Sequence, residues 1–181
     1  MPVNRSLIAP TSNPVLERAL REKLHRRSEL AGKLGELEPL AVRIGLMQNT
    51  LKPRFLEPQL VIFAADHGIA VDGLSHTPEL AQTSEAVHQL LTGRMPVAVF
   101  AHIQGMNLSV VDSGVAESLA PHPRLLARKI AHGTRNARAN SAMSVEQAHA
   151  AIRAGMEIAD GLAGNAVACA GLGTEIGRAH V

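Results

Sequence analysis

The sequence of 181 residues has no tryptophan, no tyrosine and a single cysteine. The shortage of aromatic side chains removes the usual stacking platform for single-stranded nucleic acid. A formal net charge of +2 gives no strong attraction to nucleic acid or to a membrane surface. The lone Cys169 excludes an internal disulfide and indicates a reducing compartment, and no apolar run approaches the ~20 residues that span a bilayer. We therefore expect a cytoplasmic protein without nucleic-acid or membrane partners.

Metal and cofactor motifs are also missing. Nine histidines are scattered along the chain without an HExxH pattern or a cluster of cysteines. Neither a Walker A sequence nor a Gly-x-Ser-x-Gly nucleophile motif occurs. Cys169 lies inside an apolar stretch, where we expect a core residue rather than a nucleophile. The sequence therefore predicts no bound metal and no cofactor.

The most informative stretch runs from residue 60 to residue 68. Its first five residues, Leu60–Ala64, are apolar without alternation, which is typical of a strand buried on both faces of a parallel sheet. Asp66, His67 and Gly68 come where this strand ends, and open α/β sheets bind ligands outside the carboxyl ends of their strands. The same three residues also suit an ordinary turn, with Gly68 supplying a positive φ.

Further apolar segments repeat this pattern. Residues 107–114 end in an acid and a glycine, and residues 166–170 are followed by Gly171 and Gly173. A shorter strand is expected at 125–131. Because strands alternate with helical segments, we predict an α/β fold. The expected architecture is a Rossmann-like three-layer arrangement with a mostly parallel sheet, incomplete at the C-terminus and preceded by a helical N-terminal segment.

Apolar periodicity and capping residues predict the helices. They are expected at 14–29, 36–49, 78–92, 96–104 and from Ser144 onward. Gln147 completes a capping box with Ser144. The expected buried stripes are Leu37, Leu40, Ile44 and Met47 in the second helix, and Ala148, Ile152, Met156 and Ala159 in the last. Ser84 falls on the apolar stripe of the third helix, where it either bonds back to a helix carbonyl or lines a pocket.

The chain is expected to have three parts. These are a helical segment at 1–58, a partial Rossmann-like α/β domain at 59–174 and a non-native tail at 175–181. The DNA string ATC GGA AGA GCA CAC GTC encodes Ile176–Val181 and reads as a sequencing-library adapter. Such a segment is excluded from fold reasoning. We interpret the chain as the truncated N-terminal portion of a longer protein.

Five segments in register resemble one family. They are 33–38 (Lys-Leu-Gly-Glu-Leu-Glu), 63–75 (Phe-Ala-Ala-Asp-His-Gly-Ile-Ala-Val-Asp-Gly-Leu-Ser), 110–115 (Val-Val-Asp-Ser-Gly-Val), 128–136 (Arg-Lys-Ile-Ala-His-Gly-Thr-Arg-Asn) and 142–144 (Ala-Met-Ser). Their order and spacing resemble those of nicotinate-nucleotide–dimethylbenzimidazole phosphoribosyltransferases.

The resemblance implies a homodimer that transfers phosphoribosyl from nicotinate mononucleotide to 5,6-dimethylbenzimidazole or a related lower-ligand base. The products would be α-ribazole 5′-phosphate and nicotinate, in cobalamin biosynthesis. The implied base-binding pocket contains Asp66, His67, Ser75, Thr77 and Ser84, and the implied phosphate site contains Gly171 and Gly173. The family's general base is a glutamate late in the chain. No catalytic residue is therefore assigned here, and we expect residues 1–181 alone to be inactive.

Four positions depart from the family's pattern. The family has Ser, Tyr, Gln and Glu where this chain has Lys33, Thr77, Ser84 and Gly171. Smaller side chains at 77 and 84 would widen the base pocket, so we hypothesise that the full-length protein accepts a different or broader set of bases. The departures leave two alternatives open: a nucleotide-binding α/β protein of other chemistry, and a non-catalytic homologue that keeps the fold.

Overall fold

A computed structural model describes residues 10–72 and 83–173. The chain divides into two compact units, Met1–Arg54 and Phe55–Val181, and each is described by itself. The expected division at 58/59 therefore falls four residues away from the observed one. The segment expected as a non-native tail lies outside the described residues.

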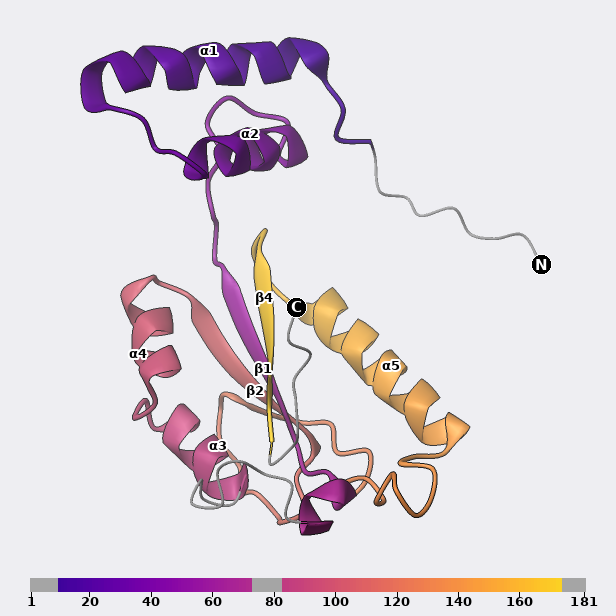
Figure 1. Cartoon of the computed structure of the whole chain (residues 1–181). Helices are drawn as coiled ribbons and strands as arrows, with labels where there is room; N and C mark the ends of the chain where they lie inside the picture. The colour runs from indigo at the N-terminus through magenta and orange to yellow at the C-terminus, as the bar shows by residue number, and fades with distance from the viewer. Residues whose placement is uncertain (1–9, 73–82, 174–181) are drawn as a thin grey trace, which may run out of the picture. The chain divides into compact units, whose positions relative to one another are not determined.

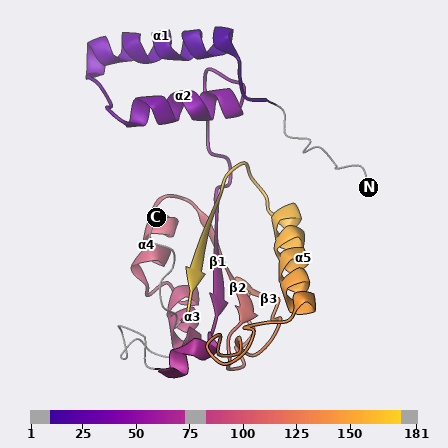
Figure 2. The ribbon, with the colours of Figure 1, turned by 45° about the vertical axis from the view of Figure 1, so that its right-hand side comes forward.

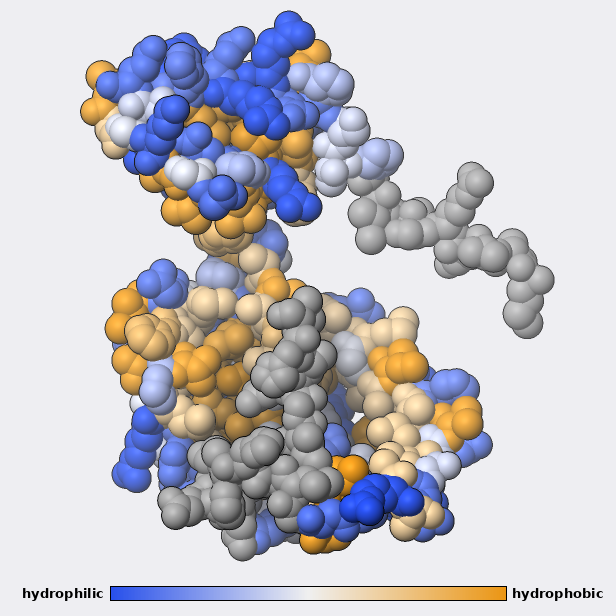
Figure 3. Space-filling view, in the orientation of Figure 1, coloured by the Kyte–Doolittle hydropathy of each residue, from blue (hydrophilic) through white to orange (hydrophobic). Residues whose placement is uncertain are grey.

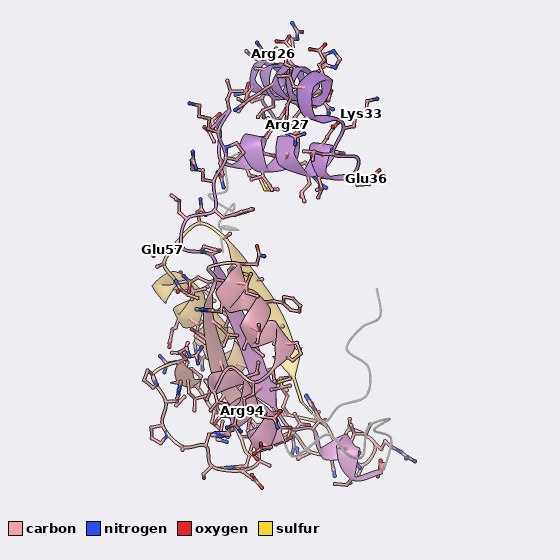
Figure 4. All side chains as sticks on the ribbon, turned by 90° about the vertical axis from the view of Figure 1, so that its left-hand side faces the viewer. Arg26, Arg27, Lys33, Glu36, Glu57 and Arg94 are labelled. Atoms are coloured by element: carbon pink, nitrogen blue, oxygen red, sulfur yellow. The ribbon has the colours of Figure 1, made fainter. Side chains whose placement is uncertain are left out.

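The first unit contains two helices, α1 (Pro14–Ala31) and α2 (Leu37–Met47). The side chain of Asn13 caps α1 by accepting from the Leu16 N–H at 3.1 Å. Gly32, with φ of 76°, follows the last residue of the helix, which ends at Ala31 rather than at Glu29 as predicted. Lys33 follows in the turn between the two helices (Figure 4).

The predicted apolar stripe of α2 is wrong. Leu37, Leu40 and Met47 are 50–65% exposed, whereas the buried residues of this helix are Val42 and Gly45. A Cβ at Gly45 would lie 2.7 Å from the methyl groups of Leu20 on α1. The two helices thus pack where the Leu20 side chain lies directly against the backbone of Gly45, because a glycine leaves room for it in a close-packed interface.

The second unit is built on a sheet whose described strands are all parallel. The strands are β1 (Gln59–Ala65), β2 (Asn107–Gly114), β3 (Leu125–Ala127) and β4 (Val167–Leu172). They lie in the order β3-β2-β1-β4 (Figure 2). The predicted positions are confirmed, although β3 ends earlier than expected and β4 ends later.

Helices cover both faces of this sheet. The helices α3 (Thr83–Leu91) and α4 (Pro96–Ile103) lie on one face, and α5 (Val145–Gly161) lies on the other (Figures 1 and 2). Alternate residues of β1 therefore enter different cores: Leu60 and Ile62 pack with α3 and α4, whereas Val61 packs with α5. This confirms the predicted three-layer α/β fold. The expected start of α3 near residue 78 lies outside the described residues.

Two predictions about buried residues are wrong in this unit. Ile152 and Met156 of α5 are 61% and 62% exposed, whereas Ile158 is buried. Cys169 is exposed rather than in the core, because β4 lies at the edge of the described sheet. Figure 3 shows apolar side chains at the surface of this unit, in agreement with the exposed Phe100 and Ile103 of α4.

No helix in the described parts of the chain is long and apolar enough to cross a membrane.

Candidate functional site

The topology of the sheet creates a crevice between β1 and β4. From β1 the chain passes through α3 and α4 to β2 on one side, and it later returns through α5 to place β4 on the other side of β1. The helices of these two connections thus lie on opposite faces of the sheet, and the strand order changes direction between β1 and β4. Ligands of open α/β sheets bind at such a switch point, outside the carboxyl ends of the strands.

Three of the predicted site residues meet at this edge. Asp66 and His67 follow the end of β1, and Gly173 follows the end of β4. A Cβ added at Gly173 would run into the carbonyl oxygen of Ala65 and would lie 3.6 Å from Cδ2 of His67. Glycine is therefore required where the end of β4 approaches the end of β1.

Gly171 does not lie beyond the strand as predicted. It pairs with Phe63 inside β4, because the strand extends to Leu172. Gly171 is therefore part of the β1–β4 ladder, and only Gly173 lies in the turn that follows. The apolar run predicts that this strand ends at residue 170, where the run meets a glycine. Glycine is depleted in strands but still occurs in them, so the strand continues to Leu172.

A small cavity opens beside Asp66 and His67, on the α5 side of the edge. Its volume is about 150 Å³. Its lining comes from the ends of β1 and β2, from residues 130, 131, 133 and 134, and from Ala142, Met143, Gln147 and Ala151. An apolar cavity of this size accommodates one benzene-sized ring. The space is smaller than the roughly 300–1,000 Å³ of a complete small-molecule pocket.

Asp66 is held by hydrogen bonds on both of its carboxylate oxygens. The Thr83 hydroxyl donates to Oδ1 at 2.5 Å, and the Ala116 N–H donates to Oδ2 at 2.7 Å. The Thr134 N–H donates to the carbonyl oxygen of Asp66 at 3.1 Å, and the Asp66 N–H donates to Gly114 at 3.0 Å. Asp66 therefore joins α3, the turn after β2 and the segment around Thr134.

Ser84 is not brought into the cavity beside His67. It lines a separate groove of about 410 Å³ between α3 and residues 118–122. Its hydroxyl donates to Oε2 of Glu117. Neither of the two roles weighed for Ser84 from the sequence included this contact. Ser75 and Thr77, the other predicted base-side residues, lie outside the described residues.

Residues 133–138 contribute to the edge and were not predicted as site residues. The Gly68 N–H donates to the Thr134 hydroxyl at 3.2 Å, and a Cβ at Gly68 would lie 2.5 Å from the Thr134 carbonyl oxygen. Asn136 and Arg138 both reach Oδ2 of Asp72, at 3.2 and 3.4 Å. The signal was present in the sequence, because a Gly-Thr-x-Asn segment after a short strand combines turn-forming and hydrogen-bonding residues.

Asp112, which ends the predicted second strand, is buried rather than open to the edge. Lys129 Nζ lies 3.1 Å from its Oδ2, and the Val115 N–H donates to its Oδ1 at 3.0 Å. A buried carboxylate needs such partners. Asp112 thus shapes the turn that follows β2.

Within the described ranges, no group of three or more histidine, cysteine, aspartate or glutamate side chains is placed to hold a metal ion.

Comparisons with known proteins identify relatives over most of the chain. A sequence model of the family described as "Phosphoribosyltransferase" matches residues 9–179. Proteins named nicotinate-nucleotide–dimethylbenzimidazole phosphoribosyltransferase are 39% identical in Janthinobacterium sp. (strain Marseille) and 40% identical in Dechloromonas aromatica. Each of these alignments covers 87% of this chain, but only 46% and 45% of the relative. The chain therefore spans about half the length of these curated relatives.

A crystal structure supports the same relationship. The protein of that name from Thermus thermophilus superposes with a TM-score of 0.75 at 31% sequence identity. The alignment covers 90% of this chain and 50% of the Thermus chain. The fold and the sequence thus point to the same relatives.

Proposed function

The chain belongs to the phosphoribosyltransferase family, and we propose that the protein to which it contributes transfers phosphoribosyl from nicotinate mononucleotide to a benzimidazole-type base. The products are then α-ribazole 5′-phosphate and nicotinate, in cobalamin biosynthesis. The observation that carries this proposal is the meeting of the ends of β1 and β4 at the crevice of the sheet, where Gly173 lies against Ala65 and His67 and Asp66 precedes His67. Such a crevice suits a flat base and a sugar phosphate.

We assign the two halves of the reaction to different sides of this crevice. The base side contains Asp66, His67, Ser75, Thr77 and Ser84, as the sequence predicts. Asp66 and His67 line the apolar cavity, which is large enough for one ring, and this supports the assignment of these two residues. The phosphate side contains Gly171 and Gly173, of which Gly173 is supported by its position in the turn after β4. Backbone N–H groups at such a turn hold phosphate oxygens.

We assign no catalytic base to residues 1–181. A benzimidazole must lose its N–H proton as the new bond to ribose forms, and general bases do this best with a pKa near the working pH. The resemblance assigns this task to a glutamate outside residues 1–181. We also propose a homodimer and a cytoplasmic location.

The test compares residues 1–181 with the longest natural form of the protein that contains them. Each is incubated with nicotinate mononucleotide and one of four acceptors: 5,6-dimethylbenzimidazole, benzimidazole, adenine or a phenol. Release of nicotinate and formation of the phosphoribosylated base are followed by chromatography. We expect the longer form to turn over and residues 1–181 to be inactive.

The outcomes separate the parts of the proposal. Turnover by residues 1–181 would overturn the placement of the catalytic base outside them. Absence of transfer by the longest form, despite binding of nicotinate mononucleotide, would favour a non-catalytic homologue, which the departures at Thr77 and Ser84 keep open. Strict preference for 5,6-dimethylbenzimidazole would contradict the wider base pocket.

A further inference from the structure

We propose that Ser113, at the end of β2, is a specificity-determining residue that selects a base with a hydrogen-bonding group on its benzo ring. The proposal rests on the proposed function, because it takes the apolar cavity beside His67 as the place of that ring. It is carried by a bulge at Ser113, by the hydrogen bonds of the other polar side chains around the cavity, and by the distance across the sheet from Ser113 to Gly173.

A bulge interrupts the pairing of β1 with β2 at Ser113. Ala64 pairs with Asp112 and Ala65 pairs with Gly114, so Ser113 is left without a partner residue in β1. Bulges re-aim side chains and are over-represented next to active sites. Ser113 lines the cavity together with residues of α5. The bulge therefore places a hydroxyl group at the wall of an apolar cavity.

The Ser113 hydroxyl is the polar group of this lining that is open to a ligand. The Thr134 hydroxyl and the Gln147 amide oxygen each accept a backbone N–H, at 3.2 and 2.8 Å. Asp66 uses both of its carboxylate oxygens. Among the described residues, no group bonds to the Ser113 hydroxyl, and no fully enclosed side-chain oxygen lacks a partner. The Ser113 hydroxyl is therefore accessible from the cavity rather than sealed within the protein.

The position of Ser113 determines which edge of the base it meets. Leu172 pairs with Ala64, so Gly173 lies level with the bulge. Ser113 is on β2 and Gly173 follows β4, with β1 between these strands. Two interstrand spacings of about 4.8 Å, roughly 10 Å in all, therefore separate the two residues. A base whose reacting nitrogen faces the ribose phosphate at Gly173 thus presents the far edge of its benzo ring to Ser113.

A hydroxyl at this place discriminates between ring substituents of the same size. A hydroxyl or amino group on the benzo ring would form a hydrogen bond with Ser113. A methyl group would instead cover the serine hydroxyl and leave it without a partner, which costs free energy. The chemical class that fits is therefore a benzimidazole with a hydrogen-bonding substituent, in preference to a methylated one.

The test uses the longest natural form of the protein and two bases of nearly equal shape, 5-hydroxybenzimidazole and 5-methylbenzimidazole. S113A removes the hydroxyl, and S113V fills its place with apolar volume. S109A is the matched control, because Ser109 lies on the same face of the same strand and outside the lining of the cavity. We measure kcat/KM for each base at a saturating concentration of nicotinate mononucleotide.

We expect the parent protein to prefer the hydroxylated base in kcat/KM. S113A should lower the ratio of the two constants about tenfold, and S113V should lower it further. S109A should leave the ratio unchanged. A parent protein that prefers the methylated base would overturn the proposal, as would a ratio that S113A leaves unchanged or that S109A lowers equally.

Binding of phenol and toluene separates this proposal from the proposed function. Each is a single ring of the size that the cavity holds, and the two differ only by a hydroxyl in place of a methyl group. Measured by ligand-observed NMR, the affinity for phenol relative to toluene should fall about tenfold in S113A and stay unchanged in S109A. If this pattern appears but no base is turned over, the Ser113 site stands and the proposed reaction is wrong. If bases are turned over without this pattern, the reaction stands and Ser113 does not select them.

Discussion

The two faces of the sheet differ in how they are covered. The face under α3 and α4 holds a core of eleven buried residues, from Leu60 to Val115. The face under α5 holds three, Val61, Val111 and Ile158. Neighbouring residues of the same strand thus enter cores of very different size.

Both the strands and the helices contribute to this difference, since Ser109 and Ser113 of β2 share the α5 face with Val111. On one face, Val87, Leu90 and Leu91 of α3 are all buried against the sheet. On the other, α5 leaves Ile152 and Met156 exposed and buries Ile158. A fully apolar strand therefore predicts that both faces are buried, but it says nothing of how well each helix packs.

The largest expected effect compares two adjacent valines of β2. Val110 and Val111 are both fully buried, and they face the α3/α4 core and the α5 core respectively. We expect V110A to lower the free energy of unfolding by about 2 kcal/mol and V111A by about 1 kcal/mol, because a dense core relaxes less around a cavity. Urea unfolding of the two variants measures the difference.

The two variants share strand, residue type and exposure, so each is the control for the other. Equal losses would show that the α5 face is as tightly packed as the α3/α4 face. A larger loss for V111A would reverse the comparison.

A smaller effect is expected at the start of α5. The Ser144 hydroxyl accepts the Gln147 N–H at 3.2 Å, and the Gln147 side chain accepts the Ser144 N–H at 2.8 Å. On the opposite face, Met95 gives α4 no side-chain cap. A helix with few buried contacts should depend more on its cap, so we expect S144A to cost about 1 kcal/mol.

Ser141 provides the control for this variant, because it is exposed and lies outside the capping box. S141A should leave the urea midpoint unchanged. If S144A also leaves it unchanged, the capping box does not stabilise this face.

Much of the fold could be predicted from local patterns. The run at Leu60–Ala64 predicted β1, and Ser144 with Gln147 predicted the start of α5, because a buried parallel strand and a capping box both depend on neighbouring residues. The faces of α2 and α5 could not be predicted in this way. Both helices have more than one apolar face, and the choice depends on partners distant in sequence, such as Leu20 against Gly45.

The candidate site was likewise predictable only where it depends on residues that are close in sequence. Asp66 and His67 were predicted at the edge because they follow a strand, and Gly173 was predicted with them. The partners of Asp66 were not predicted, because Thr83 and Ala116 lie 17 and 50 residues away. The pairing of β1 with β2 brings Ala116 to Asp66, and the packing of α3 on the sheet brings Thr83.

The smallest expected effect concerns pH, again at the start of α5. Hydrogen bonds from the Ser144 hydroxyl and from the Glu146 backbone N–H lower the pKa of Glu146 from its ordinary value of 4.5. A group whose pKa is lower in the folded state stabilises that state above its unfolded pKa. The contribution should therefore be complete above pH 4.5 and should disappear as the pH falls through the lowered pKa of Glu146.

The E146Q variant should lose this dependence, so its urea midpoint should differ from that of the parent protein near neutral pH and converge with it in acid. Carboxyl NMR titration should show the pKa of Glu146 returning toward 4.5 in S144A, and an unchanged pKa would mean that the hydroxyl does not support this carboxylate.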